Sequence, residues 1–341
     1  MNEQKPKKER LLTAIIISLS VVGILYFGGR AVYENTRRNQ QNPFKYDVDS
    51  FKQSGADRIS HREIQKIELD LEHVLAIAIG PDDNLYVSGD SSILVMDKAG
   101  QVQSKTETES AVHCLAVDEK GNVYTGMNDH VEVFDELGAH KAVWAPPADE
   151  AIFTSIAVSP SAVFVADAGN LIIWKFDRSG NLLLRIGDKN AAKDIPGFII
   201  PSPFFDVAVD PDGFLWAANT GRHSLENYTP DGDLRTIWGE FSMEIEGFCG
   251  CCNPSHFVVL EDGTFVTSEK GIPRVKIYNR LGEFVSVVAG PDLFQEGTVG
   301  LDLARDSSQR IYILDPAQKA VRVFAVIIDG EGSQESELSN R

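Results

Sequence analysis

Three of the four cysteines in this 341-residue chain lie within four positions of one another, directly before an Asn-Pro pair. They are Cys249, Cys251 and Cys252, and the fourth, Cys114, lies far upstream. Thiols can pair into disulfides, ligate soft metal ions, or attack electrophiles as thiolates. The cluster is therefore the first candidate for chemistry.

A disulfide that fastens the local loop is the structural interpretation. A bond between the adjacent Cys251 and Cys252 needs a strained geometry, because their Cα atoms are only ~3.8 Å apart across a trans peptide. Strained disulfides are more easily reduced, which would give such a pair a redox function.

A metal centre is the second interpretation, with one or more loop cysteines joined by His256 or His223 to bind copper, zinc or iron. The C-x-C-C spacing lacks the two-residue gap of ordinary zinc knuckles. A catalytic thiol or thiol–disulfide relay is the third interpretation, and unpaired, inert thiols are the fourth. The residues alone leave all four open.

A second set of candidate residues is basic and lies on both sides of the cysteine cluster, in the segments NTGRHS and SEKGIPR. These residues are Arg222, His223, Lys270 and Arg274. Together they predict a positive notch that captures a carboxylate or another anion, since the arginine fork suits a bidentate grip. Pairing with neighbouring glutamates such as Glu226 and Glu269 is the alternative.

Composition limits the partners of these residues. The apolar content of 43% is enough for a substantial core and excludes wholesale disorder. Residues 1–40 contain seven basic and three acidic groups, which leaves 25 basic and 47 acidic groups in the remainder, a net charge of −22. Such a body repels a phosphate backbone, so we expect no nucleic-acid partner.

The N-terminal segment predicts a membrane location. Residues 11–28, which begin at Leu11 and end at Gly28, carry no charge and approach the length that spans a ~30 Å hydrocarbon core. Basic residues just before this stretch predict a cytoplasmic N-terminus at the inner membrane of a bacterium, with the rest of the chain periplasmic. A cleaved signal peptide is the alternative. The other predicted parts are a basic tip (1–10), a polar stalk (29–62) and a disordered acidic tail (329–341).

Between the stalk and the tail the sequence repeats six times. Each unit has a short β-branched run, a Pro/Asp/Gly turn, a second apolar run and then a third and often a fourth strand. The residues that end the second strand are Gly89, Met127, Asp167, Asn219, Glu269 and Asp315, which are 38 to 52 positions apart. This pattern predicts an all-β, six-bladed propeller over residues 63–328. The last unit lacks a fourth strand, which we expect residues 63–70 to supply.

The segment VFVADAGNLIIWKFDRSGNLLLRIG resembles an NHL-type repeat, and the resemblance covers residues 63–328. The motif FCGCCNP (248–254) and the following DGTFVTSEKGIPRVKIYNRLGEF (262–284) are similar to membrane-anchored bacterial NHL-repeat proteins. The resemblance implies the propeller fold. It leaves the chemistry open, because propellers include lyases, lactonases, redox enzymes and binding platforms.

The propeller alignment brings the candidate residues to one face. At the start of the innermost strands it predicts a column that consists of Ala76, Cys114, Ser155, Asp206, His256 and Gly300. The polar residues that end the second strands are expected to bond backbone groups. The long loops before blades 4, 5 and 6 lie on the same face, where propellers keep function.

Two functions follow from this arrangement. The first is a binding or scaffold module that holds a partner protein or a small anionic ligand through the loops of blades 4 and 5. The alternative is a redox or metal-dependent component, for electron transfer or a lyase-like or hydrolase-like reaction. Its centre would draw on the loop cysteines, Cys114, His256 and Asp206. The sequence does not decide whether the chain is an enzyme.

Overall fold

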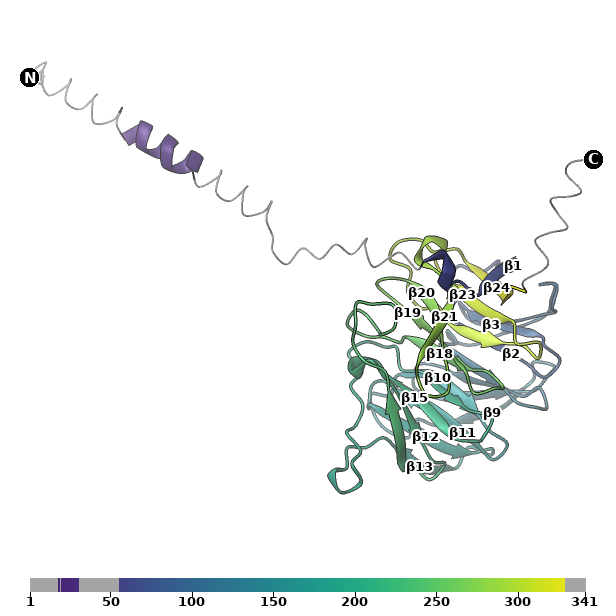
Figure 1. The fold of residues 1–341 in the computed structure, drawn as a ribbon. Helices are drawn as coiled ribbons and strands as arrows, with labels where there is room; N and C mark the ends of the chain where they lie inside the picture. The colour runs from purple at the N-terminus through teal and green to yellow at the C-terminus, as the bar shows by residue number, and fades with distance from the viewer. Residues whose placement is uncertain (1–17, 19, 31–54, 329–341) are drawn as a thin grey trace, which may run out of the picture. The chain divides into compact units, whose positions relative to one another are not determined.

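The computed structural model describes residue 18, residues 20–30 and residues 55–328. Residues 55–328 form six four-stranded antiparallel sheets, arranged radially as the blades of a propeller (Figure 1). This confirms the predicted fold class and blade number. In each sheet the strands follow one another from the innermost to the outermost, and only the last blade takes a strand from elsewhere in the chain.

The first three blades contain twelve strands. Blade 1 consists of β2 (Ala76–Ile79), β3 (Leu85–Gly89), β4 (Ser92–Met96) and β5 (Val102–Glu107). Blade 2 consists of β6 (Cys114–Val117), β7 (Val123–Gly126), β8 (Val131–Phe134) and β9 (His140–Trp144). Blade 3 consists of β10 (Phe153–Val158), β11 (Ala162–Asp167), β12 (Ile172–Asp177) and β13 (Leu182–Ile186).

The other three blades complete the ring. Blade 4 consists of β14 (Val207–Val209), β15 (Leu215–Asn219), β16 (Ser224–Tyr228) and β17 (Leu234–Trp238). Blade 5 consists of β18 (His256–Val259), β19 (Phe265–Glu269), β20 (Arg274–Tyr278) and β21 (Phe284–Ala289). Blade 6 consists of β22 (Leu303–Arg305), β23 (Ile311–Asp315), β24 (Ala320–Val326) and β1 (His61–Glu68).

Side chains in the turns set the outer hairpins. Asp97 Oδ1 accepts hydrogen bonds from the amides of Ala99 and Gln101, and Asp177 closes the corresponding turn of blade 3 in the same way. Gly180, the last residue of that Asp-x-x-Gly turn, has φ of 88°, a conformation that glycine adopts without strain. The Asp-x-x-Gly pattern therefore fixes where these strands reverse.

Aromatic residues fill the spaces between blades. The Trp144 ring of blade 2 lies 5.4 Å from that of Phe176 in blade 3, and Trp216 of blade 4 lies 4.7 Å from Phe265 in blade 5. Tilted and edge-to-face contacts at these distances stabilise packed cores. The core is thus divided into inter-blade layers around the central axis.

The ring closes through β1, as predicted from the sequence. This strand pairs antiparallel with β24 from His61↔Val326 to Glu68↔Ala320, and Ile67 is buried at 6% exposure. Arg322 of β24 donates to both carboxylate oxygens of Glu63 on β1. The first strand of the propeller therefore holds its last blade.

The predicted N-terminal anchor extends beyond the described residues. Residues 20–30 are helical, whereas residues 11–17 and 19 lie outside the described part. Within the part that the structure describes, no helix has the length and apolar character needed to cross a bilayer. The predicted basic tip, most of the stalk (31–54) and the acidic tail also lie outside the described residues.

The closure predicts a sharp effect of truncation. A chain that begins at residue 69 loses β1, which exposes the edge of β24 and the surface that Ile67 covers. Burial of one such side chain contributes about 2 kcal/mol, so we expect a melting temperature lower by roughly 4–8 °C or more. A chain that begins at residue 55 keeps β1 and is the matched control. Thermal unfolding followed by circular dichroism compares them, and equal melting temperatures would contradict the closing role of β1.

Candidate functional site

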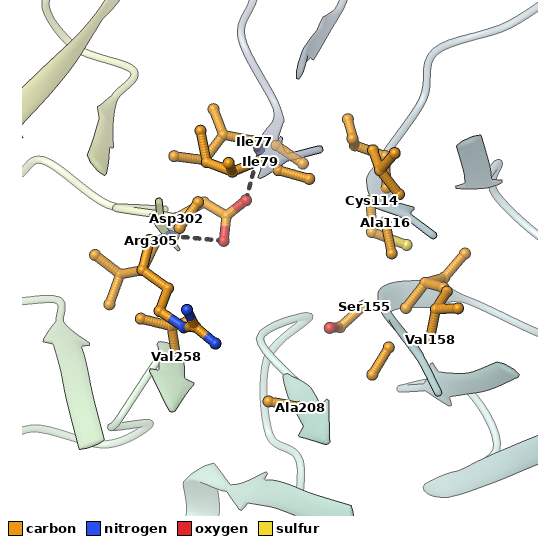
Figure 2. A pocket seen from close by; sticks show the side chains of 18 of the residues that line it. Ile77, Ile79, Cys114, Ala116, Ser155, Val158, Ala208, Val258, Asp302 and Arg305 are labelled. Carbon is orange, nitrogen blue, oxygen red and sulfur yellow. Dashed lines mark hydrogen bonds between the residues drawn. The ribbon is translucent and has the colours of Figure 1, made fainter. Parts of the chain in front are cut away.

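The innermost strands of all six blades enclose a central cavity of about 550 Å³. Figure 2 shows side chains from different blades around this space, with Asp302 on one side and Cys114 and Ser155 across from it. Small and branched residues such as Ala116, Ala208 and Val258 line the walls. Ionisable side chains of several blades, among them Asp206, His256 and Asp302, also line this cavity.

The column of residues at the start of the inner strands differs from the predicted one in its sixth member. Asp302 takes that place instead of Gly300: its carbonyl accepts the Leu314 amide at 2.9 Å, as the Asp206 carbonyl accepts the Ala218 amide. Gly300 precedes the strand in a turn with φ of 71°. The segments FDVAV (205–209) and LDLAR (301–305) share this aspartate, and aligning them would have identified Asp302.

Asp206 connects three blades. Its Oδ1 accepts the Ser155 hydroxyl of blade 3 at 2.5 Å, and its Oδ2 accepts the Phe257 amide of blade 5 at 2.7 Å. Asp302 similarly accepts the amide of Ile77 in blade 1 at 2.8 Å. Both carboxylates therefore bond neighbouring blades at the channel mouth.

His256 lies between the two aspartates in the order of the blades. Its Nδ1 is 3.5 Å from Asp302 Oδ1 and its ring packs edge-on against Phe204 at 5.7 Å. Burial raises the pKa of Asp206 to about 6, and the nearby charge of Asp302 raises it while His256 opposes this. Burial likewise raises the pKa of Asp302. Both carboxyl groups therefore ionise less readily than an exposed carboxyl, and His256 lies beside Asp302.

The structure separates Cys114 from the loop cysteines in the fold. Cys114 begins the inner strand of blade 2 and packs in the apolar cluster of Phe153 and Ile156, where burial raises the pKa of its thiol. All four cysteines are free. Among the described residues, no group of three or more His, Cys, Asp and Glu side chains is arranged to hold a metal ion.

Cys249 lies in a buried ionic cluster rather than at the surface. Its Sγ is 3.4 Å from Glu269 Oε2, and Glu269 also pairs with Arg274 and Lys276. Burial and the Glu269 charge raise the pKa of the Cys249 thiol to about 11. A thiol in this position is protonated at neutral pH and acts as a packing residue.

The same cluster fastens the loop of residues 240–256. Lys276 Nζ donates to the carbonyls of Ile245 at 2.9 Å and Gly247 at 2.6 Å, and the side chain is fully buried. Burial lowers the pKa of Lys276 to about 8, against the attraction of Glu269. Arg274 is 1% exposed, so it belongs to this buried cluster and not to an exposed notch.

Cys251 and Cys252 point toward each other, with their Sγ atoms 3.2 Å apart. Cys251 is exposed and Cys252 is buried. Burial by itself raises the pKa of the Cys252 thiol, but hydrogen bonding with Ser202 and Cys251 and the charge of Lys270 outweigh it and hold that pKa below its usual value. The hydrogen bond with Cys252 raises the pKa of Cys251.

The remaining basic candidates occupy two positions on the loop face. Lys270 Nζ donates to Ser202 Oγ at 3.0 Å and lies 4.6 Å from the centre of the Phe204 ring. The Arg222 side chain is exposed and donates to the Pro196 carbonyl at 3.4 Å, and His223 Nε2 lies 2.7 Å from the Gly250 carbonyl. The predicted notch is thus divided between a lysine beside Cys252 and an Arg-His pair on blade 4.

Comparisons with known proteins support the fold. The chain is similar to a solved structure of streptogramin B lyase at 12% identity, which covers 79% of this chain and 98% of that one with a TM-score of 0.55. It is also similar to virginiamycin B lyase from Staphylococcus aureus at 12% identity (78% and 100% covered, TM-score 0.53). A protein of unknown function from Bacteroides thetaiotaomicron VPI-5482 aligns at 15% identity (79% and 76% covered, TM-score 0.59).

No family model matches the chain, and no curated protein matches it. At these identities the likeness to solved structures shows the six-bladed propeller fold alone. The NHL-type kinship of the repeats stays a prediction.

The raised pKa of Asp206 predicts a pH dependence of stability. A carboxyl that ionises at about 6 in the folded state and near 3.8 when unfolded stabilises the protein below pH 4, and this contribution is lost as the pH rises through 6. The difference corresponds to about 3 kcal/mol. In Asp206→Ala, the Phe257 and Val207 amides and the Ser155 hydroxyl lose an acceptor, but this titration is absent. Urea unfolding at pH 4, 5.5 and 7 should therefore show that the free energy of unfolding of wild type exceeds that of Asp206→Ala by less as the pH rises. A difference that stays constant or grows with pH would contradict the assignment.

Proposed function

We propose that this protein is a membrane-anchored, extracytoplasmic binding module of the NHL-repeat type, which recognises a carboxylate-bearing segment of a partner protein through the loops of blades 4 and 5. The observation that supports the proposal is a mixed apolar and cationic patch on these loops. We call it the blade 4 patch, and it consists of Ile199, Arg222, His223 and Phe241.

The patch exposes large apolar side chains beside a cation. Ile199 is 46% exposed and Phe241 is 58% exposed. Arg222 is exposed on η3 (Thr220–Arg222), where its guanidinium donates to the Pro196 carbonyl. An exposed arginine flanked by apolar and aromatic side chains is typical of binding hot spots.

The fold holds the patch in place. The Gly221 amide donates to the Ile199 carbonyl at 2.8 Å, and Asn219 Oδ1 accepts the Ile199 amide at 2.9 Å. The His223 ring packs edge-on against Phe241 at 5.2 Å. A preformed surface loses little conformational entropy when it binds, which favours affinity.

Charge gives the patch its specificity. The chain outside residues 1–40 has a net charge of −22, so a cationic patch on it attracts a carboxylate while the surrounding surface repels other polyanions. The predicted membrane helix at residues 11–28 would keep the patch within reach of partners at the same membrane.

Charge reversal tests the patch. Arg222→Glu with Phe241→Ala should weaken capture of the partner at least tenfold, because it replaces the attracting charge with a repelling one and removes the apolar anchor. Lys141→Glu, on the outer strand of blade 2, makes the same charge change elsewhere and is the matched control. The measurement is quantitative affinity capture by the full chain in mild detergent, followed by titration with the purified partner.

The two variants separate the outcomes. Loss of capture in both would indicate a general effect of charge, and retention in both would contradict the patch. Binding of small carboxylates in place of a protein would show that the ligand is a small anion.

Fractionation tests the predicted anchor. The full chain should remain in the membrane pellet after an alkaline carbonate wash, and a chain that lacks residues 1–28 should move to the supernatant. The intact mass of the purified mature chain distinguishes anchor from cleaved signal peptide. A mature chain that begins after residue 28 would contradict the anchor.

A further inference from the structure

We propose that Cys251 and Cys252 form a dithiol that exchanges with disulfides at the mouth of the propeller. This inference goes beyond the proposed binding function and does not depend on it. Its basis is geometric: two adjacent thiols face each other at 3.2 Å, one exposed to solvent and one buried beside a lysine.

The loop gives the three neighbouring cysteines different surroundings. Cys249 is buried against Glu269, as described above, and is not available to a disulfide in solution. Cys251 is exposed and meets incoming molecules, whereas Cys252 is 2% exposed. Of the three, therefore, only Cys251 can make the first contact with a substrate.

Lys270 stabilises the thiolate form of Cys252. Its charge acts on Cys252 directly, and its Nζ is held by Ser202 Oγ at 3.0 Å and by the face of the Phe204 ring. A cation beside a thiol favours the thiolate, which is the reactive form in exchange reactions.

Asn253 fixes the distance between the lysine and the thiols. Its side chain is fully buried, its Oδ1 accepts the Lys270 amide at 2.9 Å, and its Nδ2 donates to the Lys270 carbonyl at 2.9 Å. Nδ2 also donates to the Cys249 carbonyl. The asparagine of the GCCNP motif thus ties the cysteine loop to the lysine strand end.

The exchange balances as two successive substitutions at sulfur. In the first step the Cys251 thiol passes its proton to the Cys252 thiolate, and the Cys251 sulfur attacks a disulfide R–S–S–R. A Cys251–S–S–R bond forms and RS⁻ leaves. The proton then moves from Cys252 to RS⁻, and the regenerated Cys252 thiolate attacks the Cys251 sulfur and displaces a second RS⁻. The dithiol loses two electrons, and the substrate disulfide gains them as two thiols.

The pair can also undergo the reverse reaction, in which a Cys251–Cys252 disulfide is reduced. A disulfide between adjacent residues is strained and therefore easily reduced, so a dithiol substrate can regenerate the reduced form. The co-reactants on both sides are ordinary disulfides and thiols.

The test uses oxidised glutathione with the full chain, reduced beforehand and held in mild detergent. Wild type should release two glutathione molecules per chain and end without an adduct. Cys252→Ser should stop at a single glutathione adduct on Cys251, because nothing resolves it. Cys251→Ser should not react, because Cys252 is buried. Intact mass and peptide mapping identify each product.

Lys270→Met tests the lysine. Exchange should slow on the order of tenfold at neutral pH, since the Cys252 thiolate loses its counter-charge. Lys193→Met removes a lysine of another loop, paired with Asp233, and should react at the wild-type rate. Circular dichroism spectra that match wild type exclude unfolding as the cause.

Three results would overturn the proposal. They are a stable glutathione adduct in wild type, reaction of Cys251→Ser at the wild-type rate, and no effect of Lys270→Met. The patch variant Arg222→Glu with Phe241→Ala should keep full exchange, which separates this site from the binding function.

Discussion

The closure of the ring by β1 on β24 is the constraint on which the rest of the molecule depends. Six blades that each contact only two neighbours form a stable circle when the first and last are joined, and an open array would expose sheet edges. The strand pairs, the Arg322–Glu63 ion pair and the burial of Ile67 all act at this junction. A closed ring also fixes the central cavity, since every inner strand takes its place from the two beside it.

Within this ring, one position anchors the preceding loop in blades 3, 4 and 5. The residue that ends the second strand is Asp167 in blade 3, where it accepts the Ile152 amide, and Asn219 in blade 4, where it accepts the Ile199 amide. In blade 5 the position belongs to Glu269, which with Arg274 and Lys276 holds the cysteine loop. In each of these blades the polar side chain therefore ties the preceding loop to the end of the second strand.

Much of this architecture can be predicted from the sequence, because every blade of a propeller repeats the same local pattern of strands and turns. Turn aspartates and glycines mark the hairpins, and the six strand ends align without the structure. The last unit has no fourth strand of its own, and this predicts that a strand from the start of the propeller, β1, supplies it. The sequence alignment placed Gly300 instead of Asp302 in the inner column, because the repeats before blade 6 vary in length. The shared FDVAV and LDLAR segments nevertheless show which residues of blades 4 and 6 correspond.

The surroundings of each side chain could not be predicted in the same way. Arg274 and Arg222 occur in similar loops, yet Arg274 is buried because Glu269 neutralises it there, and Arg222 remains exposed. Likewise C-x-C-C does not reveal which thiol is buried. Which thiol is buried depends on Glu269 and Asn253. The fold places these two residues against partners that are distant in the sequence.

The two candidate sites share one aromatic ring. Phe204 packs against His256 at the channel mouth at 5.7 Å and against Lys270 beside the thiols at 4.6 Å. Lys270 in turn influences Cys252, and His256 faces Asp302. Phe204 therefore contacts both the histidine that faces Asp302 and the lysine that acts on Cys252, so one aromatic ring lies between the polar groups of the channel mouth and the thiol pair.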